Sequence, residues 1–180
     1  LRCPELAFLQ PADFPQLPEV AEDGATFDAN ARKKAGTLAA LTGVSTLADD
    51  SGLEVDFLQG APGVLSARYA GEPSDDGANN RKLLQQLEGV AQRAARFRCV
   101  LALAIPGQAM RTVEGSCPGR LLTAPRGGQG FGYDPLFVPD GYDRTFAELE
   151  PVIKNVISPR ARALDRARAV WGDLLRPADR

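Results

Sequence analysis

Two adjacent carboxylates, Asp49 and Asp50, follow a short apolar run over residues 44–48 and precede Ser51 and Gly52. Acidic oxygens at the end of a strand suit a hard cation, and a glycine lets the backbone turn and approach a ligand closely. We therefore expect the strand to end here, with the carboxylates at a sheet edge. Neighbouring side chains on a strand point to opposite faces, so at most one of the pair should lead the chemistry. A strand end followed by an Asx turn is the alternative.

The absence of histidine from the whole chain limits the chemistry that these carboxylates can support. A general base must then be Asp, Glu, Lys, Tyr or a metal-bound hydroxide. Hard cations such as Mg²⁺ take oxygen ligands and commonly join one or two carboxylates to the phosphates of a substrate. The composition therefore favours carboxylate chemistry with a hard cation.

Three other places in the chain carry candidate binding residues. Lys34 lies one helical turn after Asn30 at the border of an apolar stripe, where a lysine either meets phosphate oxygens or is solvated. The glycine-rich residues 127–135 include Phe131 and Tyr133, and either ring can lie against a flat ligand, although a hairpin turn is the alternative. Arg160 shares a helix face with Leu164, Ala167 and Trp171. A guanidinium on a core-facing stripe needs a partner, which a ligand in a cleft can supply.

The size of the chain predicts one domain, and its net charge excludes little about small phosphorylated substrates. The 180 residues suffice for one domain with a sizeable core, and a formal net charge of −2 argues against a general nucleic-acid binder. The three cysteines, Cys3, Cys99 and Cys117, form no CxxC pair, so neither a zinc cluster nor a disulfide framework is indicated. We find no signal peptide and no apolar run long enough for a membrane span. A reduced, cytoplasmic protein is the expectation.

The elements that must position these residues alternate between helix and strand. Capping residues and apolar spacing predict helices over residues 26–41, 79–87 and 158–175, with Thr26 and Ser158 as N-caps. Alternating and apolar runs predict strands over residues 44–48, 53–58 and 95–105, and residues 111–116 should form a hairpin with the last of these. Residues 11–23 are expected to be a loop. The pattern is typical of an α/β domain with a mixed sheet flanked by helices.

Four separated motifs resemble those of the inosine triphosphate pyrophosphatases, also described as dITP/XTP pyrophosphatases. They are the run ADDSGLEVD at 48–56 continued by GAPGVLSARY at 60–69, the helix start with Thr26, Phe27, Asn30, Ala31 and Lys34, the run FGYDP at 131–135, and Lys154 with Ile157, Ser158 and Arg160. The resemblance extends over nearly the whole chain. It implies an elongated sheet, two lobes with a central cleft, a homodimer, and Mg²⁺-dependent hydrolysis of ITP, dITP and XTP to the monophosphate and pyrophosphate.

The resemblance also assigns roles to individual residues. It implies that Asp50 is the general base and a metal ligand, that Glu22 is a second metal ligand, with Glu19 as the less well-placed alternative, and that Lys34 contributes to catalysis. Residues implied to contact the substrate are Ser51, Phe131, Gly132, Tyr133, Asp134, Lys154, Pro159 and Arg160. In this scheme Phe131 stacks on the base and Asp134 hydrogen-bonds to it. Arg160 carries only donors, which suits the 6-keto oxygen of hypoxanthine or xanthine and not the amino group of adenine.

The chain departs from the family pattern in two places. The family's first strand and its phosphate-binding loop with Asn and Lys have no counterpart, so we expect residues 1–180 to be a single domain whose encoded sequence continues upstream of Leu1. Pro159 stands where the family usually has histidine, which should loosen selection among bases. Two alternatives remain open: a hydrolase of other modified nucleotides, or a nucleotide-binding protein without catalysis if that loop is truly absent.

Overall fold

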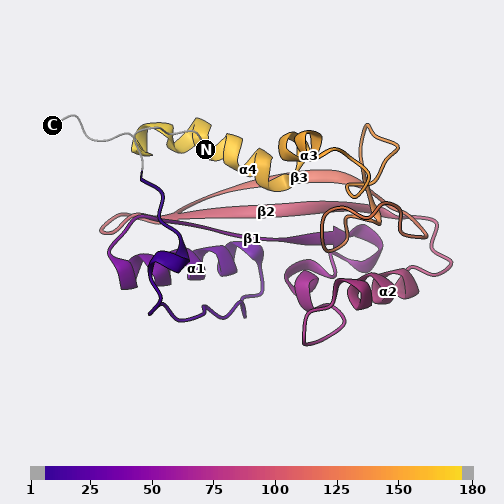
Figure 1. The fold of residues 1–180 in the computed structure, drawn as a ribbon, viewed down its shortest axis with the longest axis horizontal. Coiled ribbons are helices and arrows are strands. Elements are labelled where there is room, and N and C mark those ends of the chain that lie inside the picture. Colours follow the sequence, from indigo (N-terminus) through magenta and orange to yellow (C-terminus); the bar gives the residue numbers. More distant parts are fainter. Residues whose placement is uncertain (1–6, 176–180) are drawn as a thin grey trace.

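A four-stranded sheet runs the length of the molecule (Figure 1). The computed structural model describes residues 7–175, and the strands lie in the order β1 (Thr46–Val55), β2 (Ala94–Ala104), β3 (Arg111–Leu121) and β4 (Phe137–Pro139). All three pairings between these strands are antiparallel. The predicted α/β class is confirmed. The parallel pairing that a mixed sheet requires does not occur among these four strands.

The described residues also form four α-helices and four short 3-10 helices. They are α1 (Phe27–Thr42), α2 (Asp76–Gln86), α3 (Pro151–Ile157) and α4 (Pro159–Trp171), with η1 (Pro11–Asp13), η2 (Asp56–Leu58), η3 (Gly63–Arg68) and η4 (Gly172–Leu175). None of the helices in this part of the chain has both the length and the apolar character that a membrane crossing needs. The sequence had not predicted α3. It starts at Pro151 and ends where Ser158 caps the next helix.

Local signals explain why α1 and α4 form where they do. The Thr26 hydroxyl accepts a hydrogen bond from Ala29 N at 3.1 Å, and Gly43 ends α1 with a left-handed φ of 69°. At the other end of the chain, the Ser158 hydroxyl accepts from Ala161 N, and Pro159 occupies the first helical position. Side-chain caps satisfy backbone N–H groups that a helix otherwise leaves unpaired. Both predicted helix starts are therefore confirmed.

One lobe consists of the sheet between two helices, and β2 contributes alternate residues to the two faces. Val100, Ala102 and Ala104 pack with the alanine stripe of α1, while Cys99, Leu101 and Leu103 pack with Ala163, Ala167 and Trp171 of α4. Helices α1 and α4 therefore cover opposite faces of the same half of the sheet (Figure 1). The period of two along a strand produces this division directly.

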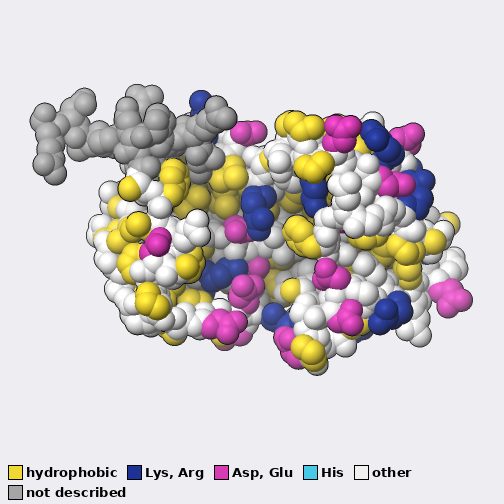
Figure 2. Space-filling model, in the orientation of Figure 1, with side chains coloured by type: hydrophobic (Ala, Val, Ile, Leu, Met, Phe, Trp, Pro, Cys, Tyr) yellow, Lys and Arg dark blue, Asp and Glu magenta, His cyan; other side chains and the backbone are white. Residues whose placement is uncertain are grey.

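The other lobe has its own core at the far end of the same strands. Leu53 and Val55 from β1 pack with Leu83 and Leu87 from the helix α2 region and with a group of aromatic side chains, which are Tyr69, Tyr133, Phe137 and Phe146. The strands β1 to β3 continue from one lobe into the other. Acidic and basic side chains gather in the hollow between the two lobes (Figure 2). The expected two-lobed architecture with a central cleft is confirmed.

The strand that carries the two carboxylates does not end at them, which corrects our expectation. β1 continues from Thr46 to Val55 and stays paired with β2 at every position, so residues 44–48 and 53–58 are not separate strands. Gly52 is needed for close packing and not for a turn. A Cβ at this position would lie 2.4 Å from Ser66 Oγ and 2.6 Å from Gly63 O. Gly52 thus allows the η3 segment to pack directly on the strand.

The described cysteines are buried thiols. Cys99 and Cys117 are both free, and burial raises the pKa of Cys99 to about 12 and that of Cys117 to about 11. Thiols with such pKa values are protonated at neutral pH and are poor nucleophiles. Cys3 lies outside the described residues. Among the described residues, neither Cys99 nor Cys117 belongs to a group of three or more potential metal ligands.

Candidate active site

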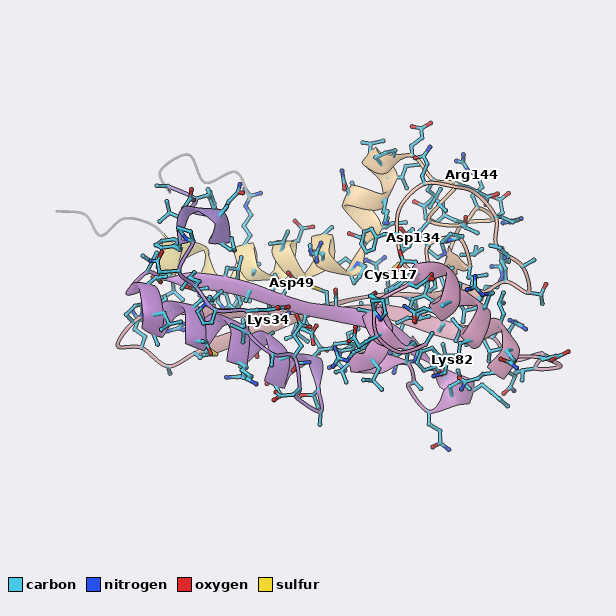
Figure 3. All side chains as sticks on the ribbon, turned by 60° about the horizontal axis from the view of Figure 1, so that its bottom comes forward. Lys34, Asp49, Lys82, Cys117, Asp134 and Arg144 are labelled. Carbon is cyan, nitrogen blue, oxygen red and sulfur yellow. The ribbon has the colours of Figure 1, made fainter. Side chains whose placement is uncertain are left out.

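The candidate site lies at the middle of β1, where the strand passes between the two lobes. Asp50 and Asp49 point to opposite faces of the sheet, Asp50 toward α1 and Asp49 toward α4. Figure 3 shows the labelled Lys34 on the α1 side of β1 and the labelled Asp49 on the side of α4. The alternation predicted from strand geometry is therefore confirmed, and the two acids belong to two different environments.

Asp50 is a buried carboxylate held by several donors. Its side chain is 8% exposed, Asn30 Nδ2 donates to Oδ2 at 2.9 Å, and the Ser51 backbone N–H donates to Oδ1 at 3.0 Å. Lys34 Nζ lies 3.7 Å from Oδ1. Burial raises the pKa of Asp50 above its ordinary value, and the hydrogen bond from Asn30 and the charge of Lys34 oppose that rise. A carboxyl whose pKa is raised is better suited to accept a proton near neutral pH.

Glu22 approaches the same lysine from the loop that precedes α1. Its Oε1 lies 2.9 Å from Lys34 Nζ, so Glu22 and Asp50 flank a single ammonium group. The loop is fixed by its backbone as well, since Arg68 Nη2 donates to Glu22 O at 2.7 Å and Gly24 N donates to Asn30 Oδ1 at 2.7 Å. Lys34 is thus part of the cluster and not a solvated lysine.

Glu19, the alternative to Glu22, is exposed and forms no ion pair among the residues that the structure describes. Of the two glutamates, only Glu22 comes close to the Lys34 and Asp50 pair.

Arg160 lies on the opposite face of β1, at the start of α4. Its Nη2 and Nε atoms donate to the same oxygen of Asp49 at 2.8 and 3.2 Å. The helix face had suggested that Arg160 points toward the core. Its side chain is 56% exposed and lies instead at the rim of the helix–sheet interface. Asp49 is the partner that the guanidinium needed. Pro159 stands directly before it, at the first helical position.

Phe131 to Asp134 form an ordered turn at the edge of the second lobe. The Phe131 side chain is exposed (71% of the residue surface), and its N–H donates to Asp134 Oδ2 at 3.0 Å. Asp134 is buried and forms an ion pair with Lys154, whose Nζ also lies 4.8 Å from the centre of the Phe131 ring. These three predicted residues therefore lie together (Asp134 is labelled in Figure 3).

Tyr133 is oriented differently from Phe131. It is buried, its hydroxyl donates to Ser66 O at 2.9 Å, and burial raises its pKa above the ordinary value. Its ring is part of the core of the second lobe and cannot lie flat against a ligand. Of the two aromatics that the sequence offered, only Phe131 presents an exposed ring.

The ionisable residues distinguish this cleft from the apolar cavity elsewhere in the molecule. A cavity of about 460 Å³ lies between residues 7–17 and the start of β1, and side chains such as Leu38, Leu103 and Trp171 line it. Among the described residues that line it, none is acidic or basic. The cleft instead brings Asp50, Glu22 and Lys34 together. Carboxylate oxygens are the ligands of hard cations, and a lysine beside them can bind phosphate oxygens.

Two residues that support this site had been assigned no role from the sequence. Asn30 bonds to both Asp50 and Gly24, and Arg68 bonds to the backbone of Glu22. A signal for Asn30 was present in its position, because it lies one helical turn before Lys34 on a stripe otherwise made of buried apolar residues. A buried amide requires polar partners, which here are the carboxylate and the loop.

Comparisons with known proteins agree with this arrangement. The model of the Ham1 family matches residues 4–170. A protein of Desulforamulus reducens named dITP/XTP pyrophosphatase is 58% identical over 164 residues, which cover 90% of this chain and 82% of that protein. A Bacillus licheniformis protein of the same name is 54% identical over 160 residues, or 88% of this chain and 82% of the relative.

Solved structures give the same result. The Ham1 protein of Staphylococcus aureus has a TM-score of 0.91 at 36% identity, and the match covers 96% of this chain and 90% of the other. A HAM1 protein from Coxiella burnetii has a TM-score of 0.90 at 41% identity, covering 96% and 89%. Sequence and fold therefore lead to the same group of proteins.

Proposed function

Because this chain belongs to the Ham1 family, we propose that it hydrolyses non-standard purine nucleoside triphosphates, such as ITP, dITP and XTP, to the monophosphate and pyrophosphate. The names of the relatives, dITP/XTP pyrophosphatase, support this substrate class. The observation that carries the proposal is the buried Asp50 carboxylate, which lies beside Lys34 and Glu22 in the cleft between the lobes. The cluster combines a carboxylate that can accept a proton, an ammonium group and a second carboxylate, which suit the hydrolysis of a phosphoanhydride.

The donor set fits a divalent cation, and we propose Mg²⁺ as that ion. Asp50 and Glu22 would hold it, since both offer carboxylate oxygens and both approach the same lysine. Over residues 7–175, no group of three or more His, Cys, Asp or Glu side chains is placed to hold a metal ion. Magnesium commonly uses one or two carboxylates and takes the remaining ligands from water and substrate phosphates. When bound, it would offset the negative charge of the phosphates.

In the proposed mechanism Asp50 accepts the proton of the water that cleaves the bond between the α- and β-phosphates. Asn30 and the Ser51 N–H hold the two carboxylate oxygens of Asp50 in place, so this general base is oriented before the substrate arrives. Lys34 would bind phosphate oxygens, because its ammonium group lies in the same cluster. Ser51 follows Asp50 on β1, and its side chain lies on the opposite, α4 face of the strand, where it would contact another part of the substrate. None of these steps requires a histidine.

The purine base of the nucleotide would be bound on the other side of the cleft. We assign stacking to the exposed Phe131 ring and hydrogen bonding to Asp134 with Lys154, while the backbone of Gly132 and Tyr133 shapes the turn. Arg160 would donate to a 6-keto oxygen. An adenine amino group there would leave these donors unpaired, which disfavours adenine. Pro159 offers no side-chain hydrogen bond, so selection among bases should be looser.

The assembly and the location of the protein complete the proposal. We propose a homodimer that acts on free nucleotides in the cytoplasm, as a single domain over residues 1–180. Nucleic acid is not among the proposed substrates, since the net charge of −2 gives no general attraction to phosphate backbones.

A pyrophosphate-release assay with ITP, XTP, ATP and dUTP, each with and without Mg²⁺, tests the function. We expect pyrophosphate and the nucleoside monophosphate from ITP and XTP only with the metal, and much slower turnover of ATP. Preferential turnover of dUTP would instead identify a hydrolase of other modified nucleotides. Tight binding of ITP without any pyrophosphate release would identify a nucleotide-binding protein without catalysis. Either of these results would overturn the proposal.

A further inference from the structure

Two side chains of α2 hold both polar groups of the Gly132 backbone. The Gly132 N–H donates to Asp76 Oδ2 at 2.6 Å, and the Gly132 carbonyl accepts from Asn80 Nδ2 at 2.9 Å. Asp76 and Asn80 lie one helical turn apart, so both face the same side of the helix. The contacts join segments 52 and 56 residues apart in the sequence. Gly132 is thus clamped at its N–H and its carbonyl by one helix.

The helix that supplies this clamp is itself firmly placed. Leu83 lies in the core of the second lobe, and Leu87, which ends the helix, lies there as well. Asn79 is 1% exposed, and its amide accepts from Ala70 N and donates to Ala67 O. The side chain of Asp75 caps the start of the helix by accepting from Ala78 N. Helix α2 is therefore a rigid support.

The segment that is clamped has little regular structure of its own. Residues 127–135 contain four glycines, and Gly132 has a left-handed φ of 59°, a conformation open to glycine and costly for most other residues. A glycine-rich turn has many accessible conformations. Contacts from outside therefore act together with the internal Phe131–Asp134 hydrogen bond to select the conformation in which Phe131 is exposed and Asp134 is buried.

The orientation of the Asn80 amide follows from the same contact. Its Oδ1 atom is buried and has no hydrogen-bond partner among the described residues. The reversed orientation would place Oδ1 against the Gly132 carbonyl, where two acceptors would face each other. A buried unpaired acceptor costs free energy, so the fold accepts this cost and keeps the donation to Gly132.

We propose that Asp76 and Asn80 are positioning residues that determine base selectivity by holding Gly132 in place. Gly132 directly follows Phe131 and precedes Tyr133 and Asp134, so a rotation of its peptide moves both the exposed ring and the buried carboxylate. The inference rests on the proposed function, in which this turn binds the base. Neither residue touches the substrate; each acts through the backbone of Gly132.

The test compares the variants Asp76→Ala, Asn80→Ala and Asn80→Asp with the conservative Asp76→Asn and with Gln85→Ala as a matched control. Asn80→Asp preserves shape but removes the donor, and Asp76→Asn retains an oxygen that can accept from Gly132 N. Gln85 is exposed on the same helix, and its side chain forms no hydrogen bond within the described part of the chain. Melting temperatures confirm that each variant is folded.

Three readouts are measured on each variant: hydrogen exchange of residues 127–136, the dissociation constants of IMP and AMP by calorimetry, and kcat and KM for ITP and ATP. We expect faster exchange in this segment and a loss of about tenfold in the preference for IMP in the three disruptive variants, as for one lost hydrogen bond. The KM for ITP should rise, while kcat changes little because Asp50 is untouched. Asp76→Asn should restore the wild-type preference, and Gln85→Ala should keep it.

Several results would overturn the inference. Unchanged exchange and unchanged IMP preference in the disruptive variants would show that α2 does not position the turn. An equal loss in Gln85→Ala would show a general effect on the helix. Failure of the wild-type protein to hydrolyse ITP would overturn the proposed function alone, because the exchange measurement needs no substrate and still tests the clamp.

Discussion

Arg160 donates two hydrogen bonds to one oxygen of Asp49, whose neighbour Asp50 faces the other side of the same strand. The Arg160 guanidinium therefore binds Asp49, and the buried carboxylate belongs to the next residue of β1. In the proposed function one serves base recognition and the other serves chemistry. In that proposal, the pairing of β1 with β2 would keep these two groups in a fixed relation.

Replacement of Arg160 tests its role in selecting the base. We expect Arg160→Ala to lower the preference for ITP over ATP by about tenfold, since a donor to the 6-keto oxygen is lost. Asp49→Asn should lower it less, because the guanidinium remains but is held more loosely. The ratio of kcat/KM values for the two nucleotides measures both effects. An unchanged ratio in Arg160→Ala would contradict the assignment.

The role of Asp50 as the general base is tested by the isosteric change Asp50→Asn. Turnover of ITP should fall by a factor of about 10²–10⁴, the usual contribution of a positioned general base, or by more if the metal is also lost. Nucleotide binding should largely survive, since Lys34 and the turn with Phe131 are unchanged. Single-turnover rates and calorimetric binding separate the two effects. Activity near that of the wild type would exclude Asp50 as the base.

The raised pKa of Asp50 predicts a pH-dependent stability of the metal-free protein. The folded state holds this proton more tightly than the unfolded chain, so the free energy of unfolding falls as the pH rises from 3.8 through the raised pKa. At a pH above the raised pKa, the carboxylate is ionised and the full cost is present. In EDTA, Asp50→Asn should therefore melt at a higher temperature than wild type at such a pH.

That difference in melting temperature should shrink as the pH is lowered toward 3.8, where the Asp50 carboxyl becomes neutral. Added Mg²⁺ should also reduce it, because a bound ion stabilises only the wild-type site. A difference that stays the same at every pH would show that the charge of Asp50 is not its cause.

The proposed metal site is tested at Glu22. We expect Glu22→Gln to raise the Mg²⁺ concentration for half-maximal activity by about tenfold or more, since one of two carboxylate ligands is lost. The rise in melting temperature that Mg²⁺ produces should weaken in parallel, which gives a readout independent of turnover. Glu19→Gln, on the same loop but outside the cluster, is the control. Equal behaviour of both variants would remove Glu22 from the metal site.

Features that depend on neighbouring residues could be predicted from the sequence. The start of α1 at Thr26 and of α4 at Ser158 was correct, because a cap bonds to N–H groups only a few residues away. The hairpin of β2 with β3 was correct because a short turn joins them. The break in β1 was wrong. Residues that look like a strand end remain extended because β2 pairs with them along the whole strand, and that partner lies about fifty residues away.

The sequence by itself determined the kind of chemistry and the opposed directions of Asp49 and Asp50, since composition excludes histidine and strand geometry alternates side chains. Only the tertiary structure decided which groups meet these acids. Asn30 reaches Asp50 across 20 residues, and Arg160 reaches Asp49 across 111. Such contacts depend on how α1 and α4 pack on opposite faces of the sheet. Local patterns do not encode that packing, because it arises when distant apolar surfaces are buried together.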